Sequence, residues 1–75
     1  MIEKKICIVE DKADLREGMN LMIQYTEGYR LVGSFANCED ALEKIPGLMP
    51  DAVLMDINLP GASGIQCVSL LKSKY

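Results

Sequence analysis

The sequence predicts an α/β fold in which a doubly wound parallel sheet is built from alternating strands and helices. Three short apolar runs alternate with three segments whose apolar residues recur at helical spacing. This alternation is typical of parallel strands joined by right-handed helical crossovers. Acidic residues follow the first and third runs, as expected where two neighbouring strands end at a ligand crevice. We therefore expect the order β-α-β-α-β-α with strand order 2-1-3.

The first strand and helix come from the N-terminal third of the chain. Residues 5–9, KICIV, are apolar and rich in β-branched residues, which predicts a strand buried on both faces. The stretch DLRE resembles a capping box, with Asp14 as N-cap and Glu17 at the third helical position. Gly28 suits the C-terminal stop of this helix. Spacing of i, i+4, i+7 and i+8 predicts an apolar helix face of Leu15, Met19, Met22 and Ile23.

The second strand and helix follow directly. Residues 29–35, YRLVGSF, predict a strand, and Gly33 within it indicates a bulge or an edge position. Asn37 is expected to cap the next helix, and Pro46 with Gly47 is expected to end it. The apolar side of this helix consists of Ala41, Leu42 and Ile45.

The third unit begins at residues 52–55, AVLM, a short apolar run that predicts a buried strand. A loop over residues 58–64 leads to a third helix. The residues expected to face inward on that helix are Ile65, Val68 and either Leu71 or Leu70.

Composition argues against several kinds of partner. The chain has 75 residues and a net charge of −3, so this segment is not expected to bind nucleic acid, which needs a basic face. No apolar run approaches the roughly 20 residues that cross a bilayer, and the N-terminus turns acidic before a signal-peptide core develops. We expect a cytoplasmic location and no membrane contact.

The cysteine pattern favours a structural role. Cys7, Cys38 and Cys67 are far apart and odd in number, and the chain contains neither C-x-x-C nor histidine, which disfavours a zinc site or a Cys/His nucleophile. We expect reduced, buried cysteines that act as small apolar groups. The commonest general base is also missing.

Two of the predicted strands end in acids, Glu10-Asp11 after the first and Asp56 after the third. An acid after a strand is usually part of a solvated loop. The acid pair combined with Asp-x-x-x-Pro-Gly-x-x-Gly is far more specific. With strands 1 and 3 adjacent, three carboxylates would converge, and their mutual repulsion calls for a cation. Mg²⁺ prefers such oxygen ligands, and a carboxylate beside it can attack phosphorus and carry an acyl phosphate.

These segments resemble the receiver domain of bacterial response regulators. IVED is similar to that family's strand-one acid pair, and VLMDINLPGASG to its phosphoacceptor strand and following loop. LREGM and YRLVGSFANCEDAL are most similar to receivers of LuxR/NarL-type regulators. The resemblance runs from Lys5 to about Lys74 and implies a flavodoxin-like (CheY-like) fold. It also implies a module that takes a phosphoryl group from a sensor histidine kinase and controls transcription through its parent protein.

The resemblance implies a role for each site residue. Asp56 would be the phosphorylated aspartate. Asp11 would bind Mg²⁺ directly, Glu10 would hold it through water, and the backbone carbonyl of Asn58 would be a further ligand. Pro60 and Gly64 would shape the loop. A metal-dependent phosphatase of related topology is a weaker alternative, because it would need a second aspartate where this chain has Asn58.

The family has five βα units, and residues 1–75 match the first three, so we expect one truncated receiver domain. The Thr or Ser of strand four and the Lys of strand five are then missing. Strand 52–55 would have a free edge. We expect a homodimer in which this strand pairs antiparallel with its own copy, with domain exchange as the rival. The alternatives are a fragment of a longer protein, or a signalling-dead module that acts only through protein contacts.

Overall fold

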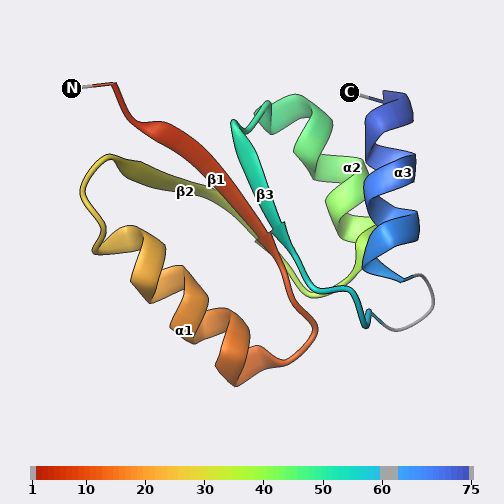
Figure 1. Ribbon diagram of the computed structural model, residues 1–75, viewed down its shortest axis with the longest axis horizontal. Helices are drawn as coiled ribbons and strands as arrows, with labels where there is room; N and C mark the ends of the chain where they lie inside the picture. The colour runs from red at the N-terminus through yellow and green to blue at the C-terminus, as the bar shows by residue number, and fades with distance from the viewer. Residues whose placement is uncertain (1, 60–62, 75) are drawn as a thin grey trace.

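The computed structural model describes residues 2–59 and 63–74, which form one parallel sheet with three helices (Figure 1). The elements in chain order are β1 (Lys4–Val9), α1 (Ala13–Gln24), β2 (Tyr29–Phe35), α2 (Cys38–Leu48), β3 (Ala52–Met55) and α3 (Gly64–Lys74). Strand β1 pairs in parallel with both β2 and β3, which gives the order β2-β1-β3. The predicted element order and strand order 2-1-3 are confirmed.

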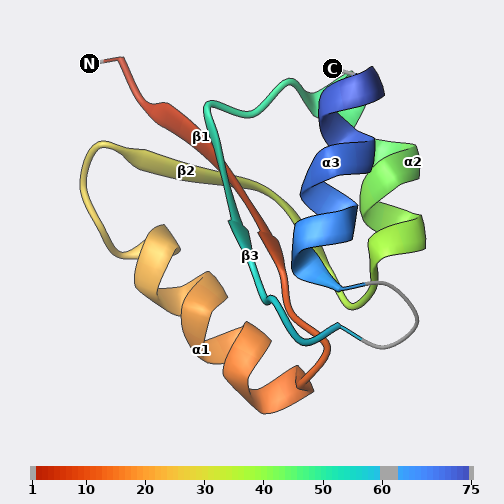
Figure 2. The same ribbon diagram turned by 45° about the vertical axis from the view of Figure 1, so that its right-hand side comes forward.

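The helices cover opposite faces of the sheet. Helix α1 lies on one side, and α2 and α3 lie together on the other (Figures 1 and 2). The central strand β1 is buried from Ile6 to Val9. Its Cys7 and Val9 belong to the main core cluster with α2 and α3. Because side chains alternate along a strand, Ile6 and Ile8 face the α1 side.

Strand β2 carries a bulge at the predicted glycine. Ile6 pairs with Leu31 while Cys7 pairs with Gly33, so the register shifts by one residue. A Cβ on Gly33 would lie 2.8 Å from the Phe35 ring. Strand β2 is also an edge strand, so both readings of Gly33 are confirmed.

Helix α1 differs from its prediction at both ends. Lys12 is the N-cap, with an extended backbone and no side-chain cap, and the capping box at Asp14 is wrong. Asp14 already lies inside the helix, where its Oδ1 accepts a hydrogen bond from the Leu15 amide at 2.9 Å. Gly28 is not the helix stop, because the helix ends at Gln24. Gly28 adopts φ +91° in the turn before β2, where a left-handed backbone favours glycine.

The predicted apolar face of α1 is only partly covered. Met19 and Ile23 are half-buried, but Leu15 is 49% exposed and Met22 is 66% exposed. No residue of α1 is fully buried. The predicted face is therefore half-buried at two of its four positions and exposed at the other two.

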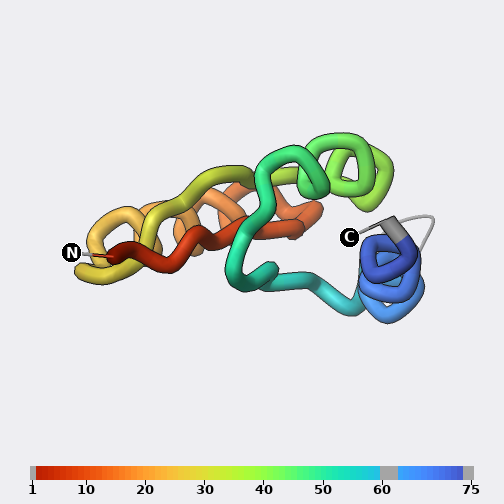
Figure 3. Tube along the Cα trace, turned by 90° about the horizontal axis from the view of Figure 1, so that it is seen from above, coloured from red at the N-terminus to blue at the C-terminus, as the bar shows by residue number. Residues whose placement is uncertain are grey.

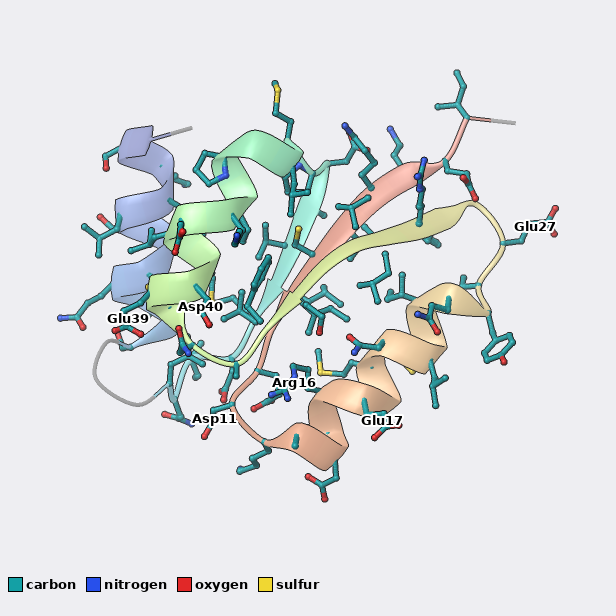
Figure 4. All side chains as sticks on the ribbon, turned by 180° about the vertical axis from the view of Figure 1, so that it is seen from behind. Asp11, Arg16, Glu17, Glu27, Glu39 and Asp40 are labelled. Carbon is teal, nitrogen blue, oxygen red and sulfur yellow. A yellow bond between two sulfur atoms is a disulfide. The ribbon has the colours of Figure 1, made fainter. Side chains whose placement is uncertain are left out.

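Helix α2 begins as predicted and ends later. Asn37 caps it by accepting a hydrogen bond from the Asp40 amide at 2.8 Å, in the acidic first turn visible in Figure 4. Ala41 and Ile45 are buried. Pro46 does not end the helix, which continues to Leu48. Proline lacks an amide hydrogen, so residue 46 donates no helical hydrogen bond, yet the helix continues for two more residues before Met49 closes it at φ 48°.

Helix α3 packs principally against α2, away from α1 (Figure 3). Its buried side chains are Cys67 and Leu71, which share one face four residues apart. The prediction for Leu71 is confirmed. Ile65 is 72% exposed and Val68 is 37% exposed, so neither is buried as predicted. None of the helices described for this chain has the length and apolarity that crossing a bilayer demands.

All three cysteines are buried, but two of them are bonded. A disulfide joins Cys38 and Cys67, whose Cα atoms lie 5.8 Å apart, while Cys7 is a free, buried thiol. The expectation of reduced cysteines is correct for Cys7 and wrong for the pair. The two residues are 29 positions apart, and only the packing of α3 on α2 brings them together.

Candidate functional site

The site is a cluster of carboxylates at the C-terminal ends of β1 and β3. Glu10 and Asp11 follow β1, and Asp56 follows β3. One carboxylate oxygen from each residue lies within 4.8 Å of the others. The cluster therefore joins residues that are 46 positions apart in the chain, from Glu10 to Asp56, through the direct pairing of two strands.

Backbone hydrogen bonds beyond the strands hold the acids in place. The Glu10 amide donates to the Phe35 carbonyl at 2.9 Å, and the Asp56 amide donates to the Val9 carbonyl at 2.9 Å. Both residues thus continue the hydrogen bonding of the sheet. The Glu10 side chain is 6% exposed, and its Oε2 accepts a hydrogen bond from the Lys12 amide at 3.2 Å.

The loop after β3 turns tightly around Asp56. The backbone amide of Asn58 donates to Asp56 Oδ1 at 3.0 Å, and the amide of Gly64 donates to the Ile57 carbonyl at 3.0 Å. A Cβ on Gly64 would overlap the backbone of Asp56 and Ile57, so a residue without a side chain is required there. Pro60, predicted to shape this loop, lies outside the described residues.

The electrostatics of the cluster divide its carboxylates. Burial raises the pKa of Glu10, and the neighbouring Asp11 and Asp56 raise it further, whereas the hydrogen bond from the Lys12 amide lowers it. The hydrogen bond from the Asn58 amide lowers the pKa of Asp56, in spite of partial desolvation. A proton held by the cluster is therefore favoured on Glu10, which leaves Asp56 ionised and available as a nucleophile.

The donor set fits a hard divalent cation. Asp11 Oδ1 is buried and has no hydrogen-bond partner among the described residues. A buried oxygen without a partner is unfavourable, and two neighbouring carboxylates add repulsion. A cation with oxygen ligands would relieve both, and Mg²⁺ has this preference.

Arg16 is a site residue that the sequence reasoning missed. Its Nη1 donates to the backbone oxygen of Glu10 at 2.8 Å, and Figure 4 shows the side chain reaching from α1 toward Asp11. The available signal was a basic residue in the first turns of the helix that follows the acid pair. The predicted capping box, which spans the same residues, does not use Arg16.

An apolar cavity of about 240 Å³ borders the site. It lies between the end of β3 and the start of α3, and it is lined by Met55, Ile57, Gly64, Ile65 and Val68. Ile57 and Gly64 are also the residues whose backbones meet beside Asp56. The cavity and the carboxylate cluster therefore share one loop.

Comparison with known proteins places this arrangement in a family. The family model for the response regulator receiver domain matches residues 6–75. The chain belongs to the response regulator receiver domain family. This receiver domain is 34% identical over 71 residues to the transcriptional regulatory protein YdfI of Bacillus subtilis, covering 95% of the chain and 33% of YdfI. It is 39% identical to a protein-glutamate methylesterase/protein-glutamine glutaminase of Syntrophomonas wolfei, covering 92% of the chain and 20% of that protein.

Solved receiver structures share the fold. A LuxR-family response regulator from Aurantimonas is 31% identical with a TM-score of 0.88, over 95% of this chain and 51% of that one. CheY from Borrelia burgdorferi, solved as a CheX–CheY–BeF₃–Mg²⁺ complex, is 27% identical with a TM-score of 0.83, over 96% and 55%. The predicted CheY-like fold and LuxR/NarL-type resemblance are confirmed. The chain spans about a third or less of the length of YdfI and of the Syntrophomonas wolfei protein.

Proposed function

We propose that this receiver domain accepts a phosphoryl group on Asp56, with Mg²⁺, from a sensor histidine kinase in the cytoplasm and so controls transcription through its parent protein. One observation carries the proposal: carboxylate oxygens of Glu10, Asp11 and Asp56 lie within 4.8 Å of one another. The domain then acts as a signalling module, with at most self-phosphorylation and self-dephosphorylation as its own chemistry.

Each site residue has a distinct role in the proposed reaction. Asp11 and Asp56 would hold the ion directly, Glu10 would hold it through water, and the Asn58 carbonyl would be a further ligand. Bound Mg²⁺ supplies positive charge that offsets the carboxylates and the transferring phosphoryl group. Asp56 attacks the phosphorus, the bond from phosphorus to the donor histidine breaks, and an acyl phosphate forms on Asp56. The Asn58 amide keeps Asp56 ionised and oriented for this attack.

Two relatives support the proposal. The Borrelia burgdorferi CheY of the same fold was solved with beryllofluoride and Mg²⁺, and the Aurantimonas protein is a LuxR-family two-component regulator. Beryllofluoride resembles a phosphoryl group bound to a carboxylate, so that structure is consistent with the chemistry proposed for Asp56.

Mass spectrometry after incubation with Mg²⁺ and acetyl phosphate tests the proposal. We expect the wild-type chain to gain the mass of one phosphoryl group and Asp56→Asn to gain none. Asp14→Asn is the matched control, because Asp14 is an exposed acid on α1 and its loss should leave the mass gain intact. An equal gain in the wild type and Asp56→Asn would disprove the acceptor role.

A second candidate function is favoured by the free edge of the sheet. Strand β3 pairs only with β1 among the described strands, and Leu54 on it is 38% exposed. A module without phosphoryl transfer would act through protein contacts, the simplest being a two-fold homodimer with β3 strands paired antiparallel. A Mg²⁺ titration separates the two functions, since only the phosphoacceptor requires the ion.

A further inference from the structure

The disulfide between Cys38 and Cys67 lies outside the carboxylate cluster, but α3, which carries Cys67, begins beside the residues that follow Asp56. Cys38 is the first residue of α2, and Cys67 lies on α3 close to its start. The two side chains are 1% and 0% exposed. The disulfide is therefore a covalent link between two helices inside the core rather than a surface feature.

Helix α3 depends on few attachments. It packs principally against α2 (Figures 2 and 3), where Leu71, Leu59 and Cys67 belong to one buried cluster. The start of α3 is also connected to the phosphoacceptor loop, because the Gly64 amide donates to the Ile57 carbonyl at 3.0 Å. A shift of α3 on α2 would therefore move the backbone next to Asp56.

We propose that Cys38 and Cys67 form a reversible redox pair, whose oxidation fixes α3 against α2 and orders Ile57 and Asn58, the residues directly after Asp56. This inference rests on the proposed function, which places the domain in the cytoplasm. Thiols there are kept reduced, and disulfides found there are usually transient and redox-sensing. The acid cluster would then be well ordered in the oxidised domain and looser in the reduced one.

Thiol–disulfide exchange with a low-molecular-weight disulfide such as glutathione disulfide supplies the oxidant. One cysteine thiolate attacks a sulfur of glutathione disulfide, whose S–S bond breaks, leaving a mixed disulfide and one released glutathione. The other cysteine thiolate attacks the protein sulfur of the mixed disulfide, forms the Cys38–Cys67 bond and releases the second glutathione. Two electrons and the two thiol protons pass from the protein to the two glutathione molecules.

Burial sets how the exchange must proceed. Because both residues are at most 1% exposed, glutathione reaches the sulfurs only when α3 separates transiently from α2. Local openings of this kind are common for elements held by few contacts. Transient loss of the contacts between α3 and α2 therefore permits oxidation, and the disulfide that forms then stabilises the same contacts.

The first test equilibrates the 75-residue chain in glutathione buffers from strongly reducing to strongly oxidising, then counts free thiols by alkylation of the denatured chain and mass spectrometry. We expect three alkylated cysteines at the reducing end and one at the oxidising end, with reversal between them. Cys7→Ala should keep the transition, and Cys38→Ala or Cys67→Ala should abolish it. A thiol count that is the same in every buffer would overturn the proposal.

The second test compares the oxidised and reduced wild-type chain, so that no substitution can affect folding. We expect reduction to lower the Tm by roughly 10–20 °C and to speed amide exchange at Ile57, Asn58 and along α3. Cys7→Ala should show the same differences. Equal exchange at Ile57 and Asn58 in both forms would overturn the link to the site.

Mg²⁺ affinity separates this inference from the proposed function. We expect reduction to weaken Mg²⁺ binding about tenfold, the scale of changes made behind direct ligands. If neither form binds Mg²⁺, the proposed function fails, while thiol counts and amide exchange still decide on the redox pair. If both bind Mg²⁺ equally well, the redox control of the site is wrong and the proposed function stands.

Discussion

Arg16 supports Glu10 through the backbone and not through its charge alone. The Nη1 atom of Arg16 lies 2.8 Å from the backbone oxygen of Glu10, at the peptide that connects the two adjacent acids. A guanidinium positioned there orders the link between β1 and α1. It also places a positive group near a cluster of negative ones.

Arg16→Ala should weaken both the fold and the site. Loss of a hydrogen bond from a charged donor is expected to lower the free energy of unfolding by about 1–2 kcal/mol, measured by urea denaturation. Mg²⁺ binding, measured by calorimetry, should weaken about tenfold because the acid pair is less well positioned. Arg30→Ala is the control, since Arg30 is exposed on β2. If Arg30→Ala causes equal losses, the effect is one of net charge only.

The raised pKa of Glu10 predicts how stability changes with pH. From the ordinary glutamate value of 4.5 up to the raised native pKa, the unfolded chain loses the Glu10 proton while the native chain retains it. Stability therefore falls as pH rises through this window. Glu10→Gln keeps an oxygen for the Lys12 amide and removes the charge. Its urea midpoint should exceed that of the wild type by an amount that grows as the pH rises through the window and stays constant above it.

Added Mg²⁺ should reverse that difference above the window. If the proposed function holds, the ion would bind the ionised native cluster and stabilise the wild type by mass action. It would stabilise Glu10→Gln less, because that variant lacks one carboxylate. The exposed residue Glu43 on α2 provides the control Glu43→Gln, for which the pH profile should follow the wild type. An identical profile for Glu10→Gln would show that Glu10 titrates as an ordinary glutamate.

Glycine substitutions should distinguish close backbone approach from open space. A Cβ at Gly64 would overlap the backbone of Asp56 and Ile57, while at Gly18 it would meet nothing within 4 Å. Gly64→Ala is expected to cost about 2 kcal/mol or more of stability and to weaken Mg²⁺ binding. Gly18→Ala, in the middle of α1, should stabilise the domain by about 0.5–1 kcal/mol. Thermal unfolding of both variants checks the pair, and a stable Gly64→Ala would contradict the tight turn.

Leu54→Lys should prevent pairing through β3 without unfolding the domain. The Leu54 side chain is 38% exposed, and lysine on an edge strand disfavours association. Light scattering should report a dimer for the wild type and an 8.3 kDa monomer for the variant. Ile2→Lys is the control, because Ile2 is 90% exposed and lies outside every strand. A wild type that is already monomeric at high concentration would rule out the dimer.

The parts of the fold that the sequence predicts are those set by local chemistry. Residues 29–35 are predicted residue for residue, because a run of strand-forming residues is bounded by Gly28 and by the helix cap Asn37. The acids at the ends of β1 and β3 could be grouped because parallel strands share the direction of their C-terminal ends. The close approach of Glu10 to Asp56 followed from that rule together with the predicted strand order 2-1-3.

The parts that the sequence misses depend on which elements pack together. Helix α3 carries apolar residues on more than one side, so its spacing does not decide between Val68 and Cys67 as the inward residue. The face of α2 decides, by burying Cys67 and Leu71. The same packing creates the Cys38–Cys67 bond, and the Arg16 contact likewise depends on how α1 lies against the end of β1.

The bulge at Gly33 makes the two borders of the sheet unequal. On the β2 border, the register shift beside Gly33 interrupts the regular ladder, and an irregular border is a poor template for another strand. Strand β3 pairs with β1 without a register shift, so the other border of the sheet is regular. Two copies joined through their β3 strands would expose only their β2 borders, which are poor templates for a third copy. Association through β3 would therefore stop at a dimer and would not extend into a fibre.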